Sequence, residues 1–187
     1  MQAAAASVAP SRACGFPVDA GRTATLARAG CGQHGSRMRL QYGRHQGRTA
    51  ETLLLRAPDY ALWVMGHQPD GRLAQYFREL AAAFDARPLQ CDCQACGAPA
   101  TRAAALPERS ELYFFCDACA LYPDAPPLGT AQDLRTLKDL ADHVERTARR
   151  RAVARLRALV RRMAQAKGLP RRITEPVAEA FFAGEVA

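Results

Sequence analysis

Four cysteines in the middle of the 187-residue chain stand in two Cys-x-x-Cys pairs, Cys93 with Cys96 and Cys116 with Cys119. Thiolates at this spacing can converge on one tetrahedral zinc ion, because each pair fits a tight turn at the end of a hairpin. The 19 residues between the pairs suit such a hairpin. Four sulfur ligands leave no open position for water or substrate, so the pattern predicts a structural Zn2+ in a zinc ribbon.

The residues around the pairs agree with a ribbon. Gly97 follows the first pair, where the turn needs a positive φ, and the run ELYFF leads into Cys116 as a strand. Cys91 offers an alternative first ligand, but only Cys93 has the two-residue spacing to Cys96. A redox role is a second alternative, and it is disfavoured because no βαβ pattern surrounds the pairs.

No catalytic pattern accompanies the cysteines. The four histidines are dispersed, and the chain has no Ser-His-Asp, phosphate-loop or clustered carboxylate arrangement. The His-x-Glu partner of a zinc deaminase site is also missing. The sequence therefore predicts that the protein is not an enzyme.

Positive charge is concentrated in one segment. The net charge is +8, and the segment from Arg146 to Arg172 holds eleven basic residues and no acidic one. The rest of the chain carries 15 basic and 18 acidic residues, a net charge of −3. Such a block favours a polyanionic partner, which is nucleic acid in the first place and an anionic membrane surface in the second.

Apolar residues recur at helical spacing through the same region, from about Ala131 to Lys167, and predict one long basic helix. Its arginines would contact phosphates on one side, with salt-sensitive binding. The expected phosphate-binding residues of this helix are Arg146, Arg149, Arg150, Arg157 and Arg161. The long helix could instead dimerise or dock on a partner, so a protein-interaction adaptor or regulator with a purely structural zinc site stays open. A last short helix starts near Thr174.

A small strand-turn-helix module is expected before the ribbon. The run MRLQYG alternates like a strand, Thr49 can cap a first helix, Pro58 opens a second, and a third follows Gly71. Arg44 and Arg48 flank the turn after the strand and are further candidates for phosphate contact. The aromatic residues expected in the core of this module are Tyr60, Trp63, Tyr76 and Phe77.

The stretch YGRHQGRTAETLLLRAPDYALWV resembles the pattern of the exodeoxyribonuclease X C-terminal-like domain, a family also described as quorum-sensing-regulated virulence factors. The resemblance covers roughly residues 38–85. Its matching positions are Tyr42, Gly43, Arg44, Gly47, Arg48, Pro58, Asp59, Tyr60 and Trp63. His45 and Gln46 stand where the family usually has an aromatic and a basic residue. The resemblance implies a small module attached to DNA-handling proteins, without established catalytic residues of its own.

The sequence thus predicts an α+β protein of four segments: a disordered extension (1–37), the exodeoxyribonuclease X C-terminal-like module (38–90), the zinc ribbon (91–122) and a basic helical region (131–187). Natural translation starting at Met38 is one hypothesis for the extension, and an organelle transit peptide is its rival. No secretory signal and no apolar run of about 20 residues is evident. The expectation is a cytoplasmic accessory protein that binds nucleic acid, DNA first.

Overall fold

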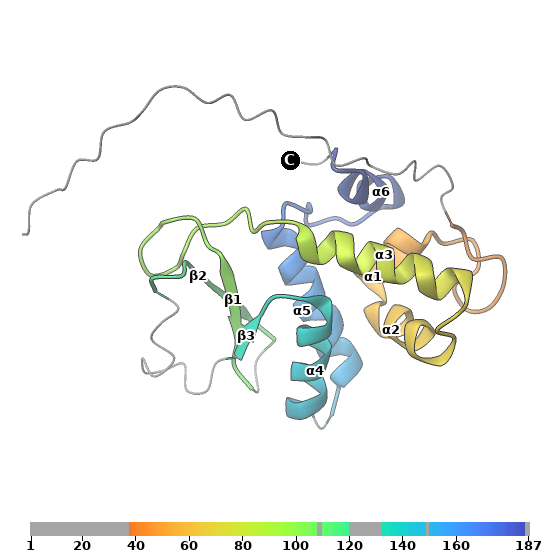
Figure 1. Cartoon of the computed structure of the whole chain (residues 1–187), viewed down its shortest axis with the longest axis horizontal. Coiled ribbons are helices and arrows are strands. Elements are labelled where there is room, and N and C mark those ends of the chain that lie inside the picture. Colours follow the sequence, from red (N-terminus) through yellow and green to blue (C-terminus); the bar gives the residue numbers. More distant parts are fainter. Residues whose placement is uncertain (1–37, 108–109, 120–131, 149, 186–187) are drawn as a thin grey trace, which may run out of the picture. The chain divides into compact units, whose positions relative to one another are not determined.

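The computed structural model describes residues 38–107, 110–119, 132–148 and 150–185. These residues form six α-helices and a three-stranded antiparallel sheet (Figure 1), which confirms the mixed α+β class. The predicted disordered extension lies outside the described residues. Within the described part of the chain, no helix has the length and apolar character needed to span a membrane.

The first three helices follow the local signals of the sequence. Helix α1 spans Ala50–Arg56, α2 spans Pro58–His67 and α3 spans Arg72–Ala86. The Thr49 side chain caps α1 by accepting a hydrogen bond at 3.5 Å from a backbone N–H of the first turn. Proline occupies the first position of α2, where its missing N–H costs nothing. The three predicted helices of this module are confirmed.

The strand predicted before α1 is wrong in extent, because the structure contains only one isolated bridge there, between Arg39 and Thr49. Gly43 and Gly47 form the turn with φ of +84° and +79°, values that glycine adopts without strain. Only two residues separate this turn from α1. The returning arm is therefore too short to build a longer ladder.

The sheet has the order β2-β1-β3, with both neighbouring pairs antiparallel. Strand β1 spans Arg102–Ala105, β2 spans Leu112–Phe115 and β3 spans Gln132–Leu134. The strand expected before Cys116 is thereby confirmed as β2. Small and branched apolar side chains of the sheet are buried and join the main core, namely Ala103, Ala105, Leu112 and Leu134.

The single long basic helix predicted for the C-terminal region is wrong. The chain forms α4 over Leu137–Thr147 and α5 over Ala152–Ala166, and these two helices pack against each other (Figure 1). Between them Ala148 leaves the helical region and Arg151 adopts a left-handed φ of 60°. A continuous helix would stack several arginines on adjacent turns, whereas the hairpin buries the apolar faces of both halves.

One hydrophobic cluster includes residues from every helix and from the sheet. Helix α6, Glu175–Ala183, follows Gly168 and packs on α1 and α3. Phe181 is fully buried, and its ring centroid lies 6.3 Å from that of Phe84 on α3. The three segments that were predicted as separate units therefore share one core. This shared core fixes the positions of the helices and strands that carry the surface residues.

The aromatic residues of the first module do not all belong to that core. Phe77 is fully buried, and Tyr60 and Tyr76 are half-buried. Trp63, in contrast, is 50% exposed on α2, so its assignment to the core is wrong.

Candidate metal centre and basic surface

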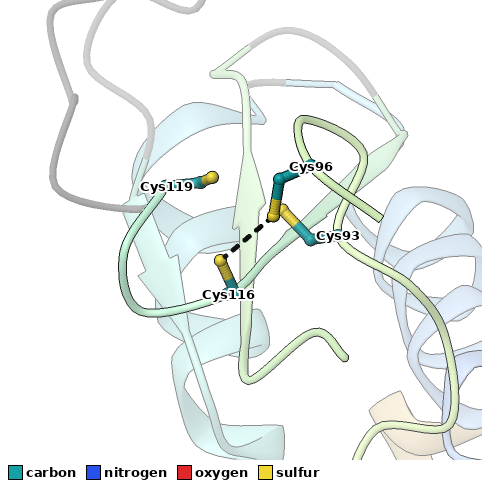
Figure 2. Close-up of side chains that lie close together, drawn as sticks. All are labelled: Cys93, Cys96, Cys116 and Cys119. Atoms are coloured by element: carbon teal, nitrogen blue, oxygen red, sulfur yellow. Dashed lines mark hydrogen bonds between the residues drawn. The ribbon is translucent and has the colours of Figure 1, made fainter. Parts of the chain in front are cut away.

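The four predicted cysteine ligands converge at one end of the sheet, as Figure 2 shows. Their sulfur atoms all lie within 4.8 Å of one another, and the Sγ atoms of Cys96 and Cys116 are 3.6 Å apart. Zn–S bonds of about 2.3 Å in a tetrahedron place sulfur atoms about 3.8 Å apart, so the cluster has the size of a zinc site. Cys93, Cys96, Cys116 and Cys119 would hold the ion, and Cys91 is outside the cluster.

Each cysteine pair lies on a tight turn held by backbone hydrogen bonds. The N–H of Gly97 donates to the carbonyl of Cys93 at 2.9 Å, and Gly97 has the positive φ, +74°, that its position predicted. The second turn closes through the N–H of Cys119, which donates to the carbonyl of Cys116 at 3.1 Å. Strand β2 ends just before Cys116, so sheet pairing positions the second turn.

The thiols of the cluster differ in acidity. Burial raises the pKa of Cys93, but backbone N–H groups that point at its sulfur, among them that of Cys116, outweigh burial and lower the pKa to about 6. Hydrogen bonds with the Cys96 and Cys116 thiols raise the pKa of Cys119 to about 12. A zinc ion must therefore displace protons from this cluster when it binds, which makes metal affinity pH-dependent.

A network of ion pairs braces the second turn against the sheet. Arg102 on β1 donates through Nε to Oδ1 of Asp117 at 2.6 Å and reaches Oδ2 of Asp133 on β3 at 3.4 Å. The hydrogen bond from Arg102 lowers the pKa of Asp117. The network links the second cysteine turn to two strands, so the scaffold of the site extends beyond its four sulfur atoms.

Most arginines predicted to bind phosphate are exposed where the structure describes them. These exposed residues are Arg44, Arg48, Arg146, Arg150 and Arg161. The first two flank the turn before α1, and the other three belong to the α4–α5 region. Arg149 lies outside the described residues.

Other basic residues of the Arg146–Arg172 segment are engaged within the fold. Arg157 donates through Nε and Nη2 to the carboxylate of Asp59 on α2, at 2.7 and 2.9 Å. Arg155 and Lys167 are buried and donate to backbone carbonyls. The charge block read from the sequence therefore overstates the positive charge that faces solvent.

A different set of arginines gathers along one concave surface. Two adjoining hollows of about 1060 and 730 Å³ share Arg56, Arg161 and Arg171 in their walls. Together with two further arginines they form what we call the arginine groove, which consists of Arg56, Arg161, Arg162, Arg171 and Arg172. All five side chains are exposed, and none forms an ion pair with another described residue. Among the described residues, Glu111 is the one acidic residue in the walls.

Sequence reasoning named Arg161 but missed the rest of the arginine groove. Arg162, Arg171 and Arg172 were counted in the basic segment without being singled out. Arg56 belongs to α1, far earlier in the chain, and no local pattern links it to α5. Only the packing of α1 against α5 brings it to the groove.

In comparisons with known proteins, the chain matches no family model, no curated protein and no solved structure. No family is therefore assigned, and the resemblance to the exodeoxyribonuclease X C-terminal-like domain stays a prediction. The four-cysteine cluster remains the feature that sequence and structure define in common.

Proposed function

We propose that this protein is a non-catalytic accessory factor that binds nucleic acid through its phosphate backbone, with a zinc ion serving a structural role. The observation that carries the proposal is the arginine groove, where five exposed arginines from α1, α5 and the α5–α6 connection line two adjoining hollows. Arginine suits phosphate because its planar group donates two parallel hydrogen bonds and stays charged at any physiological pH.

The surroundings of the groove favour an anionic ligand. The five cations of the two adjoining hollows repel one another and raise the local positive potential, and the described walls contain one carboxylate, that of Glu111. A chain of phosphates would neutralise this repulsion and release counterions to the solvent. Contacts of this type read the backbone and not the base sequence.

The zinc ion would act on the groove indirectly. Four cysteines would hold it, and the second cysteine turn directly follows β2, which packs on α5. Ser110 and Glu111, which precede β2, form part of the groove wall. A zinc ion held by the cysteines would therefore anchor the C-terminal end of β2. The residues just before the N-terminal end of β2 form part of the groove wall.

Fluorescence anisotropy with labelled DNA and RNA tests the proposal. We expect binding at about 50 mM salt that weakens roughly 100- to 500-fold at 200 mM, as five phosphate contacts require. The variant Arg161→Gln/Arg171→Gln should bind more weakly and lower the slope of log Kd against log salt by about 1.4 to 1.8. The matched control Arg78→Gln/Arg135→Gln removes two exposed arginines outside the groove and should leave the slope unchanged.

Absence of binding at low salt, or equal losses in the two double variants, would refute the proposal. Binding to vesicles of anionic lipid without binding to nucleic acid would favour the membrane alternative. A protein adaptor would show neither interaction.

A further inference from the structure

Helix α2 presents a fixed aromatic surface. The proposed contacts with the phosphate backbone of a nucleic acid do not involve this surface. Trp63 is 50% exposed, although tryptophan side chains are ordinarily buried over most of their surface. Its indole stacks on the imidazole of His67, with centroids 4.8 Å apart and ring planes at 28°. The centroid of the indole also lies 6.2 Å from that of the Tyr60 ring, with the two ring planes at 26°. Three aromatic rings on successive turns of α2 therefore form a ladder.

The ladder is held in place by its neighbours. Nδ1 of His67 donates to the carbonyl of Trp63 at 3.0 Å, which fixes the imidazole under the indole. Tyr60 packs edge-on against buried Phe77, with centroids 6.3 Å apart, and contacts the His45 ring at 4.6 Å. A ring that is half-exposed and already fixed loses little side-chain entropy when a ligand stacks on it.

Helix α2, which carries the ladder, is connected to a wall of the arginine groove through Asp59. Asp59 precedes Trp63 by one helical turn, so the two side chains share a face of α2 with about 6 Å between their Cβ atoms. The carboxylate of Asp59 binds Arg157 with two hydrogen bonds, and Arg157 lines the larger hollow of the groove. This bidentate ion pair ties the face of α2 that carries Trp63 to α5, the helix that carries Arg161 and Arg162.

We infer that the ligand of this surface is a single-stranded nucleic acid, whose phosphates occupy the arginine groove while a base stacks on Trp63. The inference rests on the proposed function and specifies its substrate. In a duplex the base faces are already stacked on one another, whereas a single strand can turn a base toward an aromatic ring. Polyphosphate or a lipid headgroup would use the arginines alone and leave the indole untouched.

Intrinsic fluorescence gives a direct test, because Trp63 is the one tryptophan of the 187-residue chain. The zinc-loaded full chain is titrated with oligo-dT, oligo-rU, a duplex of the same length and an abasic strand of the same length. Both base-containing single strands should quench the emission in step with binding measured by anisotropy. The duplex and the abasic strand should bind more weakly and leave the emission largely unchanged. A difference between oligo-dT and oligo-rU would identify DNA or RNA as the preferred source.

Two variants separate stacking from folding. Trp63→Leu should weaken single-strand binding roughly 5- to 150-fold, which corresponds to the free energy of stacking one base on an aromatic ring. Duplex binding should be unchanged. Trp63→Phe keeps an aromatic face and should recover most of the lost affinity. Equal affinity for single strand and duplex, without quenching and without an effect of Trp63→Leu, would overturn the inference while leaving backbone binding intact. Failure of every nucleic acid to bind would instead refute the proposed function.

Discussion

Replacing Lys167 with methionine tests how the C-terminal end of α3 is held. The ammonium of Lys167 is buried, with 3% of the residue exposed, and donates to the carbonyls of Phe84, Asp85 and Arg87 at 2.9, 3.1 and 2.7 Å. These carbonyls lie where α3 ends, and that of Phe84 also accepts a hydrogen bond at 3.4 Å from the N–H of Arg87, the residue that caps the helix. Methionine fills nearly the same volume without donating a hydrogen bond.

We predict that Lys167→Met lowers the free energy of unfolding by about 3 kcal/mol. Three hydrogen bonds from a charged donor contribute roughly 1.5–3 kcal/mol each, and the desolvation of the ammonium offsets several kcal/mol of that sum. For a domain of this size, the melting temperature should fall by roughly 6–12 °C. The control is Lys138→Met on α4, because the Lys138 side chain is 79% exposed in its pair with Asp142 and should contribute little to stability.

The loss should depend on pH through Asp85. Burial raises the pKa of the Asp85 carboxyl, whereas the N–H of Leu137 and the charge of Lys167 lower it. Without Lys167, that pKa rises further above its unfolded value. Such a group favours the folded state at low pH and loses this contribution as the pH rises through its folded pKa. The stability difference between Lys167→Met and the natural chain should therefore be larger at about pH 7 than at about pH 4.

Urea denaturation followed by circular dichroism at both pH values measures these quantities. The reasoning would be refuted if Lys167→Met were as stable as the natural chain, or if Lys138→Met lost as much stability. A loss that grew toward acidic pH would show that Asp85 is not the coupled group.

Three further predictions concern the metal centre and the backbone. Cys96→Ser should weaken zinc binding, measured by competition with a colorimetric chelator, yet keep the far-ultraviolet helical signal, since the six helices share a core without cysteine ligands; loss of that signal would contradict this. Gly168→Ala should lower stability by about 1–2 kcal/mol in thermal melts, because φ is +93° and the new Cβ would collide with Oε1 of Gln90. Adding Gln90→Ala to Gly168→Ala should remove the collision with Gln90 but not the strain of the positive φ. Full recovery of stability in the double variant would refute a contribution from backbone strain. Asp59→Asn should cost up to about 1 kcal/mol, measured by urea denaturation, since its ion pair with Arg157 is partly solvated; no change would show that the pair does not brace α2.

The helix boundaries that could be predicted from the sequence are those marked by a capping residue or a proline. Thr49 and Pro58 specify helix starts by local chemistry alone, and the structure has helices there. The cysteine pairs were equally local, because zinc geometry restricts their spacing. The break between α4 and α5 had no such signal, since alanine and arginine favour helices and the apolar spacing continues across Ala148. At Arg151 the backbone nevertheless adopts a left-handed φ of 60°.

The candidate binding surface was predicted only in part for a similar reason. Net charge along the chain does not distinguish an exposed arginine from one that donates to a buried carbonyl, as Arg155 and Lys167 do. Nor does it reveal that Arg56 and Arg171 line the same hollows. The sequence places Trp63 in an aromatic core with Tyr60, Tyr76 and Phe77, whereas its exposure depends on which face of α2 meets α1, α3 and α5.

The packing of α6 on α1 has a consequence for how the chain folds. Leu53, Leu54 and Leu55 of α1 are each 1% exposed, and α6, near the other end of the sequence, covers part of this helix. During synthesis the apolar face of α1 therefore cannot be fully buried until the residues of α6 have emerged from the ribosome. Contacts of such long sequence separation form slowly, because closing a large loop costs entropy before any burial compensates for it. A nascent chain that stalls before α6 would expose this leucine cluster to chaperones or to other nascent chains.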